Sequence, residues 1–399
     1  MGTGLRPLRA THRAGNTVTN PYRPFDGDAW LGRDLPLADG AYRIMQETAF
    51  EVAEELRYAR QGRKARVFKL DRPDGSTYAL KTFYRGFSLP EYATITPALA
   101  AFGDIDGLRT CRRRLVEPAE AAAIGEPGLA YAVLMPWIEG VSWAGVVEGR
   151  FPLSLATCLG LAAQTATILA ELETRGLAHA DVSSSNVVIT NADSGSAIEL
   201  IDVEDMYHDS FGSLPYVPDG SPGYAHPRNQ GRGCRNRFGD RFAGGVLLTE
   251  MLVWADPAVR QSSADVSVFE PGELCHGGPK YAMVRQVLQA HSKDAARLFE
   301  RVWDSPGPSG CPRLSEWAAT IQALGASESD APAQHPHATA EGMRCPGCGR
   351  STLLGLTIVD HKSDCPLRGP STLSPMPDKS SFPGVPAHED IGFVPLFGA

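Results

Sequence analysis

The sequence predicts an α+β fold with two lobes, a strand-rich lobe followed by a helical lobe, and a small zinc-binding module after them. Between residues 41 and 136, short apolar runs rich in β-forming residues alternate with turn signals. From residue 137 to 325, apolar residues recur at helical spacing. Because strands and helices are segregated along the chain, we expect this arrangement rather than an alternating parallel sheet. A late cluster of cysteine and histidine residues indicates the module.

The composition is that of a globular protein with a sizeable core, since 43% of the 399 residues are hydrophobic and 21% are charged. The net charge of −8 argues against a nucleic-acid-binding surface, which needs positive charge to neutralise phosphates. No apolar run reaches the length of a membrane-spanning helix, and no signal-peptide pattern is present at the start. We therefore expect a cytoplasmic protein whose eight cysteines are thiols or metal ligands.

The first lobe is expected to follow an irregular arm over residues 1–40, which are rich in Gly, Pro, Arg and Asp. Residues 65–70 and 77–83 predict two strands, because they are rich in β-formers and flank a turn at residues 71–75. A further buried strand is expected over residues 131–135.

The second lobe is expected to be helical. Leu161, Ile168 and Leu172 recur at helical spacing, and Gly176 follows where a helix end favours glycine. Further helices are predicted near residues 241–254, 279–291, 295–303 and 314–324. Residues 326–342 have the composition of a linker, and residues 367–399, rich in Pro and Ser, are expected to be disordered.

Polar residues that suit phosphoryl transfer lie on two predicted loops. His179, Asp181 and Asn186 precede the apolar segment 187–190, and Asp202 follows a second apolar segment. In phosphoryl transfer one carboxylate orients and deprotonates an acceptor hydroxyl, while an Asn oxygen and a second carboxylate hold Mg²⁺. Hard Mg²⁺ prefers such oxygen ligands. The alternative is two loops with ordinary polar turn residues, which the spacing of Asp202 disfavours.

These residues occur in the same order along the chain as the catalytic residues of the protein kinases. Residues 41–325 therefore resemble an atypical protein kinase of the Ser/Thr type. Residues 78–81, Tyr-Ala-Leu-Lys, are similar to the third-strand motif whose lysine contacts the ATP phosphates. The resemblance implies that Asp181 is the catalytic base and that Lys81 clamps the phosphates. It also implies that Asn186 and Asp202 bind Mg²⁺.

The resemblance also implies an ATP pocket. Residues 60–67 are similar to the glycine-rich loop that covers the nucleotide, although only its middle glycine, Gly62, is present. Residues 133–140 resemble the hinge that brackets adenine, with Met135 in the gatekeeper position. The implied nucleotide-binding residues are Gly62, Ala65, Val67, Lys81, Met135, Trp137 and Ile138.

Two later segments extend the resemblance. Residues 220–227, which include Ser221, resemble the end of a Ser/Thr-kinase activation segment. Residues 240–252 resemble the helix whose first aspartate anchors the catalytic loop. The resemblance therefore implies that Asp240 accepts hydrogen bonds from backbone amides around His179, and that these residues support the site.

Several positions depart from the kinase pattern. Ala180 replaces an arginine that often receives an activation-loop phosphate, and Ser183 replaces a lysine near the transferring phosphate. After Asp202, Val-Glu replaces Phe-Gly, which makes a flip of this segment less easy. Arg228 replaces the glutamate that ordinarily ends the activation segment.

The helix acid that pairs with the clamp lysine in kinases has no clear counterpart. Residues 95–101 contain no acid, and Glu91 is the nearest candidate, with a solvated helix-start residue as the alternative. Residues 112–114 are three arginines that could bind an acidic partner, but we expect a solvated face.

The C-terminal cluster has the spacing C-x₂-C-x₁₂-H-x₃-C, which can wrap four ligands tetrahedrally around Zn²⁺. Its members are Cys345, Cys348, His361 and Cys365. A complete four-ligand set leaves no open position, so we expect structural zinc within residues 343–366. Because so short a segment buries little core, the metal would supply its folding energy. Unrelated thiols in a flexible tail are the alternative.

These observations predict an ATP- and Mg²⁺-dependent kinase that phosphorylates Ser or Thr in a protein substrate or signalling partner. No nucleic-acid or membrane partner is expected. The alternative is a pseudokinase that uses the fold and the zinc unit as a scaffold. The missing helix acid and the reduced glycine-rich loop favour the scaffold, whereas the presence of Lys81, Asp181, Asn186 and Asp202 favours the enzyme.

Overall fold

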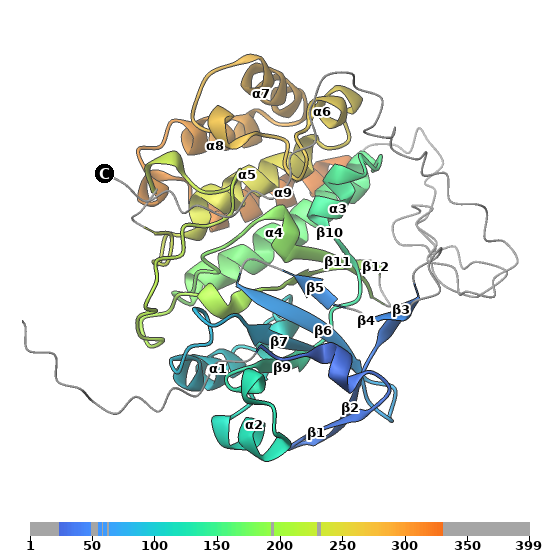
Figure 1. The fold of residues 1–399 in the computed structure, drawn as a ribbon. Coiled ribbons are helices and arrows are strands. Elements are labelled where there is room, and N and C mark those ends of the chain that lie inside the picture. Colours follow the sequence, from blue (N-terminus) through green and yellow to red (C-terminus); the bar gives the residue numbers. More distant parts are fainter. Residues whose placement is uncertain are drawn as a thin grey trace, which may run out of the picture.

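A computed structural model describes residues 24–48, 55–57, 59–61, 64–192, 195–229 and 233–329. The described part is a mixed α+β structure in which strands gather at one end and most helices at the other (Figure 1). The predicted segregation of strands and helices along the chain is therefore confirmed. Predicted features that fall within residues 330–399, including the zinc module, lie outside the described residues.

The large sheet is antiparallel and curled, with its strands in the order β1-β2-β6-β7-β9-β8, while β5 pairs with β6. The strands are β1 (Asp34–Leu37), β2 (Gly40–Ile44), β5 (Ala59–Gln61), β6 (Ala65–Asp71), β7 (Thr77–Phe83), β8 (Arg114–Leu115) and β9 (Val133–Pro136). Two short strands, β3 (Gln46–Thr48) and β4 (Glu55–Arg57), form a separate antiparallel pair.

The β6–β7 hairpin forms where the sequence predicts it. The turn closes through a hydrogen bond from the Gly75 amide to the Arg72 carbonyl, 2.9 Å, and Gly75 has the positive φ of +81° that favours glycine. Phe68, Leu70 and Leu80 point into a buried cluster on one face of the sheet. This burial is what holds the two strands in register.

The first strand begins earlier than the sequence indicates. Residues 24–40, expected within an irregular arm, form the 3₁₀ turn η1 (Gly27–Trp30) and strand β1. Leu35 and Leu37 alternate with exposed residues and are buried. The signal is weak because β1 is short and contains Pro36, which an edge strand tolerates.

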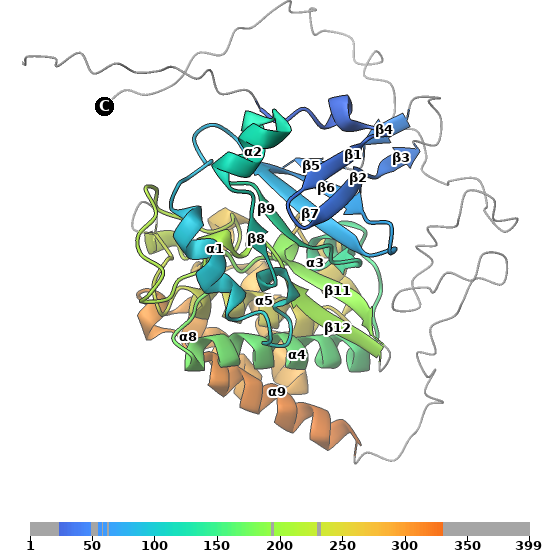
Figure 2. The ribbon, with the colours of Figure 1, turned by 90° about the horizontal axis from the view of Figure 1, so that it is seen from below.

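Two helices accompany the sheet. Helix α1 (Tyr92–Ala100) lies close to β8, and α2 (Pro118–Ile124) lies beside β1 (Figure 2). Helix α2 begins with Pro118, whose missing N–H would have no intrahelical partner, and ends at Gly125.

The helical part is built around α4 (Leu155–Thr174), α5 (Asp240–Val253) and α9 (Leu314–Ser329), with α4 and α9 side by side (Figure 2). The other helices are α3 (Trp143–Glu148), α6 (Pro257–Ser262), α7 (Pro279–His291) and α8 (Lys293–Trp303). Trp143, Trp254 and Trp317 are fully buried in its core. The helices predicted near residues 241–254, 279–291, 295–303 and 314–324 are confirmed. Helix α9 continues to Ser329, so the expected linker does not begin at residue 326.

Helix α4 requires one correction to the sequence prediction. By length and apolar composition it could cross a membrane, a property that we did not expect of any segment. Half of its apolar window is buried inside the protein, and Leu161, Leu169 and Leu172 lie in the core of the helical part. It has the character of a core helix.

A small sheet lies between the large sheet and α4 (Figure 2). It contains β10 (Val141–Ser142), β11 (Val187–Ala192) and β12 (Gly195–Leu200). The described 3₁₀ turns besides η1 are η2 (Arg109–Cys111), η3 (Pro127–Leu129), η4 (Ser184–Asn186), η5 (Val203–Asp205), η6 (Pro227–Asn229), η7 (Pro271–Glu273) and η8 (Pro308–Gly310). The small sheet places η4 and η5 at neighbouring strand ends, where the polar residues gather.

Candidate active site

The loop from His179 to Asn186 is anchored by the first residue of helix α5. The buried Asp240 carboxylate accepts hydrogen bonds from the amides of His179, at 2.5 Å, and Ala180, at 2.8 Å. These two bonds compensate its burial and hold Ala180 at a φ of +63°, a conformation that side chains disfavour. The support expected of Asp240 is confirmed.

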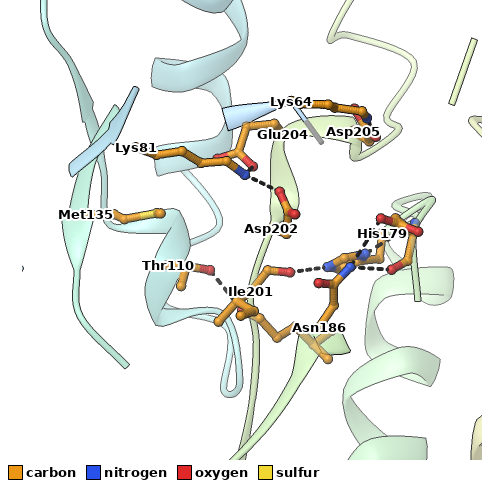
Figure 3. Close-up of polar contacts among 12 residues, drawn as sticks. Lys64, Lys81, Thr110, Met135, His179, Asn186, Ile201, Asp202, Glu204 and Asp205 are labelled. Carbon is orange, nitrogen blue, oxygen red and sulfur yellow. Dashed lines mark hydrogen bonds and ion pairs between the residues drawn. The ribbon is translucent and has the colours of Figure 1, made fainter. Parts of the chain in front are cut away.

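The ring of His179 ties this loop to the next one. Its Nε2 lies 2.9 Å from the carbonyl oxygen of Ile201, the residue before Asp202 (Figure 3). The ring itself is fully buried. The side chain of His179 therefore helps to join the loops that carry Asp181 and Asp202.

Asp181 is oriented by two polar neighbours. Ser221 Oγ donates to Asp181 Oδ1 at 2.8 Å, and Asn186 Nδ2 lies 3.2 Å from Asp181 Oδ2. The same nitrogen donates to the Asp181 main-chain oxygen at 2.8 Å. Because the Asn186 nitrogen is used in this way, its amide oxygen is the atom left to bind a cation.

Lys81, on β7, reaches two carboxylates of the segment that follows β12. Its Nζ forms ion pairs with Asp202 Oδ1 and with Glu204 Oε2, the latter at 2.6 Å (Figure 3). The side chains of Lys81 and Glu204 are buried, whereas that of Asp202 is 48% exposed toward the cleft. The sequence predicts that Lys81 and Asp202 share one site, but it does not predict that Lys81 pairs with Asp202 and Glu204.

Arg113 holds the other oxygen of Glu204. Its Nη1 lies 2.6 Å from Glu204 Oε1, and the arginine side chain is fully buried. Its Nε donates to the Thr110 carbonyl at 2.7 Å, and Nη2 lies 3.2 Å from Met135 Sδ. The expectation of a solvated arginine face is therefore wrong for Arg113.

The other two arginines of that run do lie nearer the surface. Arg114 pairs with Asp39 and with Glu120 on α2, and Arg112 faces the exposed Asp104 at 3.7 Å.

The charges of this cluster stabilise one another. Burial alone would lower the pKa of Lys81, but the attraction of Asp202 and Glu204 outweighs burial and raises it. Burial alone would raise the pKa of Glu204, but Lys81 and Arg113 hold it well below its ordinary value. Lys81 is thus a cation and Glu204 an anion across the neutral pH range.

Lys81 and Asp202, together with residues of the two loops, line a cavity of about 360 Å³ between the large sheet and the small one, whereas Glu204 and Arg113 lie behind its wall. The predicted site residues on its wall are Ala65, Val67, Lys81, Met135, Trp137, Ile138, Asp181, Asn186 and Asp202. Gly62 lies outside the described residues. The apolar end is formed by β-strand residues, and the polar end by the two loops. An apolar wall with a few convergent polar groups is typical of a small-molecule pocket.

The apolar end of the cavity has a polar rim that the sequence did not indicate. Lys69 Nζ lies 2.6 Å from Glu139 Oε2, which also accepts a hydrogen bond from Trp137 Nε1 at 3.0 Å. This pair joins the β6 strand to the segment after β9.

Glu91 does not pair with Lys81. It stands at the N-terminus of α1, where its Oε2 is buried without a hydrogen-bond partner among the described residues. The signal that could have identified Glu204 instead is its position two residues after Asp202.

The described residues include the oxygen donors for a hard cation, namely Asn186 and Asp202. The four expected zinc ligands, Cys345, Cys348, His361 and Cys365, lie outside the described part of the chain. Among the described residues no group of three or more His, Cys, Asp or Glu side chains could hold a metal ion. No family model matches the chain, and a search of curated proteins finds no match to it.

Proposed function

We propose that this chain is an ATP- and Mg²⁺-dependent phosphotransferase with a bilobal protein-kinase-like fold, which phosphorylates Ser or Thr hydroxyls of a protein. The observation that carries the proposal is the convergence of Lys81, Asp181, Asn186 and Asp202 on one cavity with an apolar end. Lys81 lies far from the other three residues in the sequence and reaches them from a different sheet, so this gathering of charged and polar groups is not a local pattern.

Each of these groups has a role that its environment supports. Lys81, kept cationic by two carboxylates, would bind phosphate oxygens of the nucleotide. The oxygens of Asn186 and Asp202 are suitable ligands for Mg²⁺, which would neutralise the charge of the transferring phosphoryl group. The apolar walls from Ala65, Val67 and Met135 suit a purine ring.

Asp181 is the group best placed to receive the acceptor proton. Ser221 and Asn186 hold its carboxylate on the wall of the cavity, so the acid does not need to reorient. In the step, an acceptor oxygen forms a bond to the γ-phosphorus as the bond to the β-γ bridging oxygen breaks. The acceptor proton passes to Asp181 and ADP leaves.

The proposal of a protein substrate rests on residues 220–227. Ser221, within this segment, contacts Asp181 directly, so a chain that presents a hydroxyl to Asp181 would lie along the segment. Arg228 Nη1 lies 3.4 Å from the Pro306 carbonyl oxygen, and no ion pair of Arg228 with an acid is seen among the described residues. The end of this segment is therefore held by a contact to a main-chain carbonyl and not by the ion pair that is usual in kinases.

One of the two arguments for the pseudokinase scaffold no longer holds. The missing helix acid favoured it because Lys81 would have lacked an orienting carboxylate, but Glu204 supplies one. The reduced glycine-rich loop still favours it.

The test is phosphate transfer from γ-labelled ATP with Mg²⁺, to the chain itself and to general protein substrates. We expect Asp181→Asn and Lys81→Met each to reduce transfer about 100-fold or more. Asp209→Asn is a matched control, because Asp209 is an exposed carboxylate that contacts only the neighbouring Tyr207 hydroxyl among the interactions seen. Transfer that persists in both variants would rule out these roles. Absence of transfer by the unchanged protein, with ATP still bound, would favour the scaffold.

A further inference from the structure

The carboxylates that contact Lys81 come from an unexpected part of the chain. Helix α1 lies beside β8 in the strand-rich part, yet residues 92–100 contain no acid. Instead, both carboxylates that contact Lys81 come from one short segment, Asp202 and the turn η5 that follows it. The polar end of the cavity is therefore assembled from the sheet and from this segment.

The segment is held firmly at both ends. The Ile201 carbonyl contacts the His179 ring, and Tyr207 exchanges backbone hydrogen bonds with Ala178, at 2.7 Å and 3.0 Å. Between these points Val203 is fully buried. Glu204 therefore projects from backbone that is fixed to the loop carrying Asp181.

The carboxylate of Glu204 is fixed as well as its backbone. One oxygen contacts Lys81 Nζ and the other contacts Arg113 Nη1, each at 2.6 Å. Arg113 is in turn held by the Thr110 carbonyl, and Thr110 Oγ1 donates to the Leu200 carbonyl at 2.9 Å. A carboxylate between two buried cations has one favourable orientation.

From this geometry we infer that Glu204 is the positioning residue for Lys81, and that Arg113 holds Glu204 for this purpose. This inference rests on the proposed function, in which Lys81 binds nucleotide phosphates. Glu204 does not touch the substrate. It acts by keeping Lys81 aimed at the cavity. Since Glu204 lies two residues from Asp202, the lysine and the Mg²⁺ ligand are aligned by one segment, and α1 is not needed to align them.

A purely structural role is the competing explanation, in which Glu204 only neutralises the buried Arg113. The two roles differ in what they predict for Lys81. If Glu204 is only a counterion of Arg113, replacing both residues by neutral ones leaves Lys81 paired with Asp202, so kcat/KM for ATP stays within a few-fold of the unchanged protein. If Glu204 positions Lys81, the same double replacement releases the lysine from one of its two carboxylates.

The experiment compares Glu204→Gln, and the double variant Glu204→Gln with Arg113→Met, against Glu199→Gln. Glu199 is a matched control, because it is a buried acid that pairs with an arginine, Arg109, and does not line the cavity. The double variant removes a charge pair together, so it remains informative if the single variant leaves Arg113 uncompensated and does not fold. A second control, Glu91→Gln, changes the acid at the start of α1.

Two readouts are measured on the full chain. The first is the rate at which acetic anhydride acylates Lys81, followed by mass spectrometry without nucleotide. We expect it to rise at least fivefold in both Glu204 variants and to stay within twofold in the two controls. The second is kcat and KM for ATP, where misplacement of the lysine is expected to lower kcat/KM about 100-fold in the Glu204 variants only.

The outcomes separate the two proposals. If Lys81 is acylated equally in the double variant and in the unchanged protein, or if kcat/KM for ATP is the same in both, Glu204 does not position the lysine and the inference is overturned. If acylation rises but the unchanged protein transfers no phosphate, the inference holds and the proposed function fails. If Glu91→Gln lowers kcat/KM as much as the Glu204 variants do, the acid at the start of α1 also orients Lys81. That result would overturn the inference as well.

Discussion

Glu250 is a carboxylate that lies outside the proposed phosphate-transfer site. It is fully buried in α5 and accepts hydrogen bonds from Tyr224 Oη at 2.6 Å, from the Val268 amide at 2.7 Å and from Ser267 Oγ. Among the described residues it forms no ion pair. Burial raises its pKa from 4.5 to about 7, although the three hydrogen bonds oppose the rise.

This environment makes stability depend on pH in a definite direction. Because the pKa is higher in the folded state, the folded state binds the Glu250 proton more strongly than the unfolded state. Its contribution to stability is therefore complete below about pH 4.5 and is lost as pH rises through about 7. The full effect is on the order of 3 kcal/mol, from 1.36 kcal/mol per pKa unit.

We predict that Glu250→Gln removes this dependence. Glutamine keeps an oxygen for the Val268 amide and places an amide donor against the Tyr224 oxygen, so the packing is retained. The free energy of unfolding is measured with urea from pH 5 to 8 in both proteins. Between these pH values the unchanged protein should lose a few kcal/mol more than the variant does. Glu171→Gln, at an exposed acid that pairs with Arg175, serves as the control. Parallel curves for the unchanged protein and Glu250→Gln would contradict the prediction.

At the scale of single residues, sequence spacing predicts some site residues and not others. A short stretch of the sequence contains Asp181, Asn186 and Asp202, so their spacing is enough to identify them as a motif. Glu204 and Arg113 are 91 positions apart, and their pairing depends on how β8 and η5 approach each other. Three successive arginines look alike in sequence, yet only Arg113 has its side chain fully buried. Local patterns do not specify such contacts.

Elements with strong periodicity were predicted well. Strand β7 and helix α7 have the bounds expected from the sequence, because each combines a clear apolar period with a turn or proline signal at its start. Strand β1 was missed because two alternating leucines beside a proline give little signal. Strand β8 has only two residues, and its pairing with β9 is set by tertiary contacts.

The segment between η5 and η6 has little regular structure and is held to the sheet through Tyr216. The Tyr216 hydroxyl donates to Asp205 Oδ1 at 2.5 Å, and Lys64 pairs with the other oxygen of Asp205. Lys64 Nζ also lies 4.7 Å from the centre of the Tyr216 ring, which packs edge-on against Phe87. One tyrosine thus joins both parts of the molecule.

We predict that Tyr216→Phe loosens this segment without unfolding the protein. The ring contacts stay, but a hydrogen bond to a charged acceptor is lost, which costs roughly 1.5–3 kcal/mol. Amide hydrogen exchange in residues 211–220 should become about tenfold faster, while exchange in α5 is unchanged. Tyr207→Phe removes a similar bond to the exposed Asp209 and should leave exchange in residues 211–220 unaffected. Equal exchange in both variants would show that Tyr216 does not hold the segment.

At the scale of the whole molecule, composition and element order were sufficient to predict an α+β structure with strands first and helices second. They do not predict how the small sheet lies between the two parts. That position arises because Ile189, Ile198 and Leu200 bury their side chains in the same core as α4. It is this arrangement that brings the ends of β11 and β12 to the cavity and with them Asn186 and Asp202.

The C-terminal module tests whether the chain contains a second folding unit beside the part that the structure describes. If Cys345, Cys348, His361 and Cys365 bind structural zinc, the purified chain should hold one zinc ion per molecule. Since cysteine binds zinc as the thiolate and histidine as the neutral imidazole, protons compete with the metal, and zinc should be lost on mild acidification or with a strong chelator.

We predict that loss of zinc unfolds residues 343–366 and leaves the rest of the protein intact. Metal content, measured with a colorimetric indicator, should fall from one ion to none in Cys348→Ser and stay at one in Cys311→Ser, whose cysteine is buried near α9. Proteolysis should then cut residues 343–366 only in the zinc-free protein, while the thermal midpoint of the main body stays within about 2 °C. Protection of those residues without zinc would contradict a metal-dependent module, and a large fall in the midpoint would show that the module and the body fold as one unit.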